Sequence, residues 1–130
     1  MSADEKNPAV DDSELEIAMS EAANGGEQFT RTLTKPVTFE GEAFDSLTFD
    51  FGSLTAADSL NIEAELAAMN RVVIVPEFSG DYLLRMAMRA CTNRRKDGRK
   101  LGIDFFQALS LGDYVKIRGK ARSFLLAAGS

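Results

Sequence analysis

Alternating apolar and polar residues mark two neighbouring runs in the first half of the chain. The first run, residues 32–39, places on one face the side chains of Leu33, Lys35, Val37 and Phe39. The second run, residues 47–51, places on one face the side chains of Leu47, Phe49 and Phe51. Gly41 stands between the runs in Glu40-Gly41-Glu42, a sequence typical of a tight turn. The pattern therefore predicts a β-hairpin.

Apolar residues at helical spacing predict several helices in the rest of the chain. The predicted helices cover residues 56–69, 80–92 and 103–109 and a last segment that begins after Ser110. Their expected capping residues are Thr55, Ser79, Asp104 and Ser110. The last helix has the clearest apolar stripe, formed by Tyr114, Ile117, Ala121, Phe124 and Leu125. Gly119 interrupts this helix, which indicates either a close packing contact or a weak point.

A short β-branched run, Val-Val-Ile-Val at residues 72–75, separates two of these helices and ends at Pro76. Its length and composition favour either a third strand against the hairpin or a buried connector. An isolated two-stranded hairpin is marginal in water, so its apolar face should pack on the helices. We expect Phe49 and Phe124 to meet in that core. The predicted fold class is α+β and mainly α: an N-terminal hairpin, with or without a third short strand, packed on three to four helices.

Charge is unevenly distributed along the chain. Residues 1–28 hold eight acidic groups and one basic group, residues 29–70 carry a net charge of −5, and residues 71–130 carry +7. Two interpretations are open: solubility with internal charge compensation, or a basic surface that meets an acidic partner. The second interpretation gives the candidate partner-binding residues, which are Arg85, Met88, Arg89, Arg94, Arg95, Arg99 and Lys100.

The domain organisation follows from the same charge pattern. Residues 1–28 offer little apolar surface to offset the entropy of ordering, so we expect an acidic, largely disordered tail. A Ser13-x-x-Glu16 box and the apolar residues after it favour a short helix over residues 13–23 as the alternative. Residues 29–130 are expected to form a single α+β domain.

The chemistry of an enzyme is missing from the sequence. The chain has no histidine, which is the commonest general base and metal ligand, and no nucleotide-binding or nucleophile motif. Its single cysteine, Cys91, falls on an apolar helix face, which is typical of a core residue. No run of about 18 apolar residues predicts a membrane span. We therefore expect a protein that is not an enzyme and has no cofactor, no metal and no membrane partner.

Nucleic acid is also disfavoured as a partner. Residues 93–100 form a predicted loop with five basic groups around an Asp97-Gly98 turn. Basic loops contact phosphates, but this loop has no aromatic residue to stack on a base, and the chain is acidic overall. A nucleic-acid-binding regulator that uses the basic C-terminal half stays open as an alternative.

Several segments together resemble the tail assembly chaperones of long-tailed bacteriophages. They are Leu33-x-Lys35-Pro36-Val37-x-Phe39-x-Gly41-Glu42, Leu47-Thr48-Phe49, Leu54-Thr55-Ala56-Ala57-Asp58 and Phe106-x-x-Leu109-x-x-x-Asp113-Tyr114-x-x-Ile117. The chain departs from that family in its acidic tail, in the basic loop and in the Asp50-Phe51-Gly52-Ser53 step after the second predicted strand.

The resemblance implies a non-enzymatic role in virion assembly. A chaperone of this kind binds the long tape measure protein and helps to recruit tail tube subunits onto it. It acts in the cytoplasm of the bacterial host and is not expected in the mature virion; a homo-oligomer is compatible with this role. A structural tail or head-completion protein is a further alternative.

Overall fold

The computed structural model describes residues 27–129, and the helix predicted for residues 13–23 lies outside them. The chain begins with two antiparallel strands, β1 (Gln28–Phe39) and β2 (Glu42–Asp50). Glu40 and Gly41, which connect them, both have positive φ angles, of 50° and 82°. A two-residue turn of this kind matches the right-handed twist of the strands that it joins. The predicted hairpin and its turn are confirmed, but β2 ends at Asp50, and Phe51, which was predicted to lie on the strand, begins a 3-10 turn.

The pairing of the two strands shifts part-way along the hairpin. Thr32 lies opposite Ser46, and the next aligned pair is Val37 with Phe44, so four residues of β1 face a single residue of β2. This irregularity breaks the alternation of β1, because Leu33 and Val37 remain buried while Lys35 points into solvent. The prediction that Lys35 shares the apolar face was therefore wrong.

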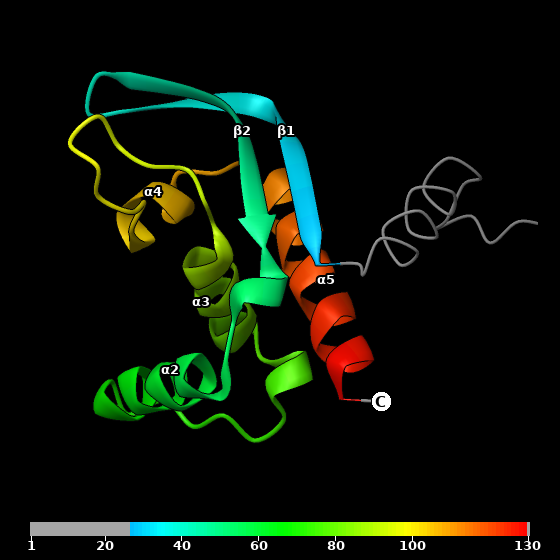
Figure 1. Ribbon diagram of the computed structural model, residues 1–130. Coiled ribbons are helices and arrows are strands. Elements are labelled where there is room, and N and C mark those ends of the chain that lie inside the picture. Colours follow the sequence, from blue (N-terminus) through cyan, green and yellow to red (C-terminus); the bar gives the residue numbers. More distant parts are fainter. Residues whose placement is uncertain (1–26, 130) are drawn as a thin grey trace, which may run out of the picture.

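Four helices follow the hairpin: α2 (Ala56–Ala68), α3 (Gly80–Ala90), α4 (Ile103–Gln107) and α5 (Leu111–Ala128). Two short 3-10 turns, η2 (Phe51–Ser53) and η3 (Pro76–Phe78), precede α2 and α3. α3 is central and contacts the other three helices, while β1 lies along α5 (Figure 1). The α+β class with a mainly helical body is confirmed.

Residues 72–75 form neither of the structures predicted for them. No strand pairs with this segment among residues 27–129, and Val72 and Ile74 are almost fully exposed. The segment runs along the outside of the molecule from the end of α2 to η3 (Figure 1). The other edge of β2 is occupied by the segment after α3, where the Thr92 amide donates to the Thr48 carbonyl at 2.8 Å. The expected third strand is therefore an exposed connector.

The core is built around Phe49, whose side chain is completely buried. Its ring stacks on Phe29 and Phe51, with centroids 5.9 Å away in each case, and Phe106 lies 6.5 Å away. Phe51 in turn stacks on Phe124 of α5 at 5.5 Å. Aromatic side chains therefore join the hairpin to α4 and α5, with Phe51 between Phe49 and Phe124.

The helix starts follow the sequence closely, with one exception. Thr55 and Asp58 form the predicted capping box of α2, and Ser79 accepts a hydrogen bond from the Tyr82 amide at 3.1 Å. α4 instead begins after Gly102, and Asp104 lies within its first turn. The expectation that Asp104 caps this helix was therefore wrong.

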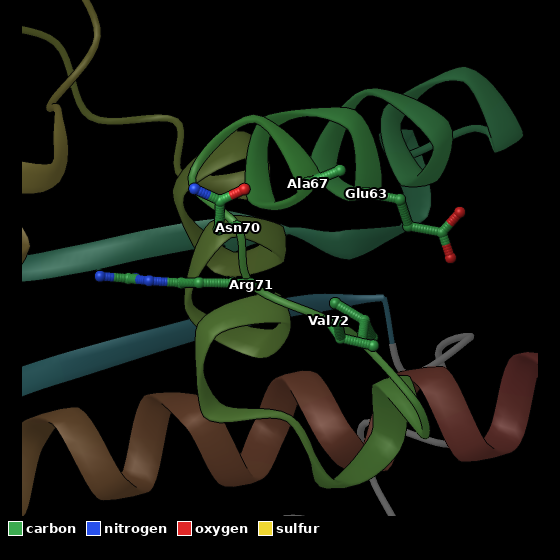
Figure 2. A pocket seen from close by; sticks show the side chains of 6 residues that line it. Glu63, Ala67, Asn70, Arg71 and Val72 are labelled. Atoms are coloured by element: carbon green, nitrogen blue, oxygen red, sulfur yellow. The ribbon is translucent and has the colours of Figure 1, made fainter.

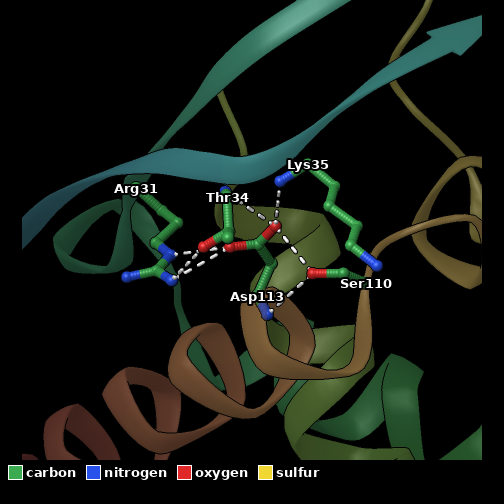
Figure 3. Close-up of polar contacts among 5 residues, drawn as sticks. All are labelled: Arg31, Thr34, Lys35, Ser110 and Asp113. Atoms are coloured by element: carbon green, nitrogen blue, oxygen red, sulfur yellow. Dashed lines mark hydrogen bonds and ion pairs between the residues drawn. The ribbon is translucent and has the colours of Figure 1, made fainter.

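Asp113 joins the start of α5 to the irregular part of β1 (Figure 3). Its buried carboxylate accepts hydrogen bonds from the backbone amides of Thr34, at 3.0 Å, and Lys35, at 3.3 Å. Arg31 donates to the same carboxylate at 3.1 Å, and the Ser110 hydroxyl does so at 2.9 Å. Burial opposes ionisation of this carboxyl, but the four donors outweigh it and hold its pKa well below the ordinary value.

Candidate functional site

Arg89, one of the predicted partner-binding residues of α3, connects this helix to α2. The Arg89 guanidinium donates to Asp58 and to Glu65 of α2, at 2.9 Å in each case. The hydrogen bond to Glu65 raises the pKa of Arg89, and the Thr55 amide lowers the pKa of Asp58. Arg85 lies 3.6 Å from Asp81 on its own helix. Arg89 therefore joins α3 to α2 by bridging two carboxylates, whereas the ion pair of Arg85 lies within α3.

Met88, the uncharged member of the predicted set, is half-buried. Its side chain packs against the edge of the hydrophobic core. This placement favours the ordinary core role over an adaptable binding surface.

The predicted cations of the loop between α3 and α4 also bond within the chain. Arg95 pairs with Glu40 at the hairpin turn and lies 5.6 Å from the centroid of the Phe39 ring. Arg99 donates to Asp97 at 2.8 Å, within the turn that Gly98 completes. The Glu40 contact holds the loop beside the hairpin turn.

Arg94 and Lys100 face each other at the base of this loop. The Arg94 guanidinium donates to the Cys91 carbonyl at 3.2 Å, and the Lys100 ammonium donates to the Arg89 carbonyl at 2.8 Å. Burial lowers the pKa of Lys100, and the nearby Arg94 lowers it further. Each of the six predicted cations thus has a polar contact within the chain. Arg85, Arg89, Arg95 and Arg99 pair with carboxylates. Arg94 and Lys100 donate to neutral backbone carbonyls.

The outward side of α5 exposes apolar side chains that the sequence analysis did not select. This α5 outer face consists of Leu111, Val115, Gly119 and Leu126, which are spaced by four, four and seven residues. Leu111 is 76% exposed and Leu126 is 51% exposed. A Cβ atom built on Gly119 has no described neighbour within 4 Å, so no internal contact explains a glycine there. The signal was present in the sequence as a second apolar stripe opposite the core stripe.

Basic side chains border the α5 outer face. Between its ends α5 carries four basic residues and a single acidic residue, Asp113, which is buried. Arg122 donates to the Glu77 carbonyl at 2.8 Å and lies over the Phe78 ring, while Arg118 lies over Tyr114. These aromatic contacts fix cations beside the helix without neutralising their charge.

The connector after α2 is the second apolar surface. Val72 and Ile74 are 84% and 85% exposed, and Phe78 is 74% exposed. An open hollow of about 540 Å³ beside Val72 is lined by α2 and the connector (Figure 2). The residues that line the hollow are Glu63, Ala67, Asn70, Arg71, Val72 and Val73.

Residues 27–129 contain no group of three or more potential metal ligands, and no helix among them is long and apolar enough to cross a membrane. The Cys91 thiol is buried, and burial raises its pKa, which disfavours the reactive thiolate. The α5 outer face offers a partner apolar contact area that is bordered by basic side chains.

Comparisons of this chain with protein-family models, with curated proteins and with solved structures find no match. The resemblance to tail assembly chaperones therefore rests on the sequence segments given above, and the function is argued from them together with the surfaces of the molecule.

Proposed function

We propose that this protein is a phage tail assembly chaperone that binds the tape measure protein through the α5 outer face. The observation that carries the proposal is that α5 has apolar residues on two sides. One side is buried in the core, and the other side is exposed. An exposed apolar helix face is the kind of surface that receives an amphipathic client helix. The sequence resemblance supplies the identity of that client.

The dimensions of the α5 outer face suit a helix–helix contact. Leu111 and Leu126 are separated by 15 positions, which at a rise of 1.5 Å per residue corresponds to roughly 22 Å along the axis. Gly119 lies near the middle, where the absence of a side chain lets a second helix come close to the α5 backbone. The client helix would place its apolar side chains over Leu111, Val115 and Leu126, with its axis crossing at Gly119.

Charge defines the rest of the client's chemistry. The basic residues of α5 border the apolar face, so a client helix with acidic flanks is favoured over a basic one. The cations of α3 and of the loop between α3 and α4 contribute to the positive field of the C-terminal half even though they are hydrogen-bonded within the chain. In this proposal they increase the association rate of the client more than they slow its dissociation.

The proposed role is non-enzymatic and transient. The chaperone covers apolar helices of the tape measure protein in the cytoplasm of the bacterial host and helps tail tube subunits to assemble on it. It then leaves the assembly and is absent from the mature virion. Neither a cofactor nor a membrane is part of this role.

Coexpression with the tape measure protein of the same genome tests this function. We expect the client to stay in the soluble fraction and to coelute with the chaperone, and to aggregate with an empty vector. The purified chaperone should not retard DNA at physiological salt. Sequence-specific DNA binding with a steep salt dependence would instead support a regulator. Recovery of the chain from purified virions would support a structural tail or head-completion protein.

A further inference from the structure

The acidic N-terminal part of the chain contains an apolar stripe of its own. In a helical register, residues 13–23 place four apolar side chains on one side, which are Leu15, Ala18, Met19 and Ala22. Acidic residues border this stripe, with Glu14 and Glu21 on one side and Glu16 on the other. An isolated helix of this length is marginal in water, so a helix here requires a surface that covers the stripe.

The α5 outer face has the complementary pattern of charge. By their helical positions, Arg118 and Arg122 border this face on one side, and Lys116 and Lys120 border it on the other. An acidic amphipathic helix on this face would meet cations along both of its borders, which favours the contact electrostatically. A second copy of the same face would instead bring cations against cations, so self-association through α5 is disfavoured.

The described chain begins beside α5, within reach of its outer face. β1 lies along α5 (Figure 1), and the Lys120 ammonium is 5.3 Å from the centroid of the Phe29 ring at the start of this strand. Residues 24–26, Asn-Gly-Gly, connect residue 23 to residue 27 in four steps, which reach roughly 14 Å when extended. That reach exceeds the diameter of a helix, about 10–12 Å, so the connection can pass around α5.

The lengths of the two apolar stripes also match. Val115 and Leu126 lie 11 positions apart on α5, or roughly 16 Å along its axis. Residues 13–23 in a helix would extend about 15 Å. Gly119 lies between Val115 and Leu126 with open space at its Cβ position, so the alanines of the acidic segment can approach the α5 backbone closely there.

We propose that residues 13–23 dock as a helix on the α5 outer face, between Val115 and Leu126. The occupant of this part of the face, when no client is present, is thus the chain's own acidic segment. Leu111 lies a full helical turn beyond Val115 and stays accessible next to the docked segment.

The docked segment competes with the client for α5, a consequence that rests on the proposed function, whereas the docking itself does not. The apparent affinity for the client falls in proportion to the fraction of molecules in which the face is open. A client helix long enough to start at Leu111 would displace the segment from that end. The acidic segment therefore keeps most of the apolar face covered until such a client is bound.

NMR spectra of the full chain test the docking without a client. Leu15→Gln removes a large side chain from the apolar stripe, and Ile17→Gln removes one from the opposite side of the same helix, with no change of charge in either variant. We expect Leu15→Gln to shift the amide signals of Val115 and Gly119, and Ile17→Gln to leave them in place. Unchanged signals in both variants, or equal shifts in both, would overturn the docking.

Hydrogen exchange of the full chain gives the reciprocal test from the side of α5. In the parent protein, the amides of residues 17–23 should exchange more slowly than in a free peptide of the same sequence. Leu126→Gln should speed this exchange, and Leu60→Gln should not, although the two leucines are 51% and 65% exposed. Thermal melts of both variants provide the folding control. Exchange at the rate of the free peptide in the parent, or equal exchange in the two variants, would contradict the proposal.

The affinity for the tape measure protein separates the docking from the proposed function. If the face is open in a tenth of the parent molecules, a variant that releases the segment should bind the client about tenfold more tightly. We therefore expect tighter binding by Leu15→Gln and parental binding by Ile17→Gln. Equal affinities in the two variants would contradict the competition. A client that binds none of the three proteins would contradict the proposed function alone, because the spectra and the exchange rates decide the docking.

Discussion

Replacing Gly119 by alanine should make the protein more stable. The residue lies inside α5, and a Cβ atom there meets no described atom within 4 Å. Alanine restricts the unfolded chain and does not expose the helix backbone as glycine does, which is worth about 0.5–1 kcal/mol at an open helix position. For a domain of this size the thermal midpoint should rise by about 2–5 °C.

Thermal and urea unfolding of the two proteins measure this change directly. Gly41→Ala is the matched control, because Gly41 also has open space around its Cβ position but holds a φ of 82°. An L-residue in that conformation costs about 1–2 kcal/mol, so this variant should be less stable than the parent. A Gly119→Ala protein that is less stable than the parent would show that the glycine is required inside the fold, and the reasoning about the α5 outer face would fail.

Further predictions concern the buried Asp113 carboxylate, the ion pairs of Arg89 and the aromatic core. Asp113→Ala should cost about 3–5 kcal/mol in urea unfolding, because it leaves Arg31 and the backbone amides of Thr34 and Lys35 without their buried acceptor. Since folding lowers the pKa of Asp113, its carboxylate should contribute fully to the free energy of unfolding above the ordinary pKa of 3.8. At lower pH this contribution should fall by about 1.4 kcal/mol per pH unit. A free energy of unfolding that stays constant below pH 4 in the parent protein would contradict this. Arg89→Ala should cost about 1 kcal/mol, because its two ion pairs with α2 are partly exposed, and a double-mutant cycle with Asp58→Ala should show the coupling. Phe49→Ala should lower the free energy of unfolding by about 3–5 kcal/mol, and Phe124→Ala should lower it clearly less, because Phe124 is half-buried. Equal losses in the two variants would contradict this prediction.

The elements that could be predicted are those whose signals are local. Both strands, the Glu40-Gly41 turn and the Thr55 and Ser110 caps depend on residues within a few positions of one another. Periodicity also identified Phe49 as a core residue. The fold class, a hairpin and then several helices, could be predicted from these local signals.

What could not be predicted depends on which face of an element is covered. Helical spacing over residues 56–69 places Leu60, Ala64 and Ala67 on one face, but the residues buried against the core are Ile62 and Leu66. α2 is apolar on both sides, so periodicity alone cannot choose between them. For the same reason the sequence analysis did not identify the α5 outer face. It also predicted residues 72–75 to be paired or buried, whereas they form an exposed connector.

Contacts between distant residues account for the remaining differences. Ser110 was predicted to cap the last helix, but the hydrogen bonds of nearby Asp113 to Thr34 and Lys35 depend on the shifted pairing of β1. Arg95 was predicted to bind a partner protein, but in the fold it pairs with Glu40, which lies 55 positions away in the chain. Local patterns contain no information about which carboxylate a cation will meet in the folded chain.

The dissociation constant for the tape measure protein tests the central claim most directly. The decisive comparison is between Leu111→Gln and Leu60→Gln, which remove leucines that are 76% and 65% exposed without a change of charge. Loss of a buried leucine contact is worth about 1.5 kcal/mol, or roughly tenfold in affinity. The account predicts that Leu111→Gln binds the client about tenfold more weakly than the parent, with Leu60→Gln unchanged. Equal affinities for all three proteins, or a loss confined to Leu60→Gln, would contradict it.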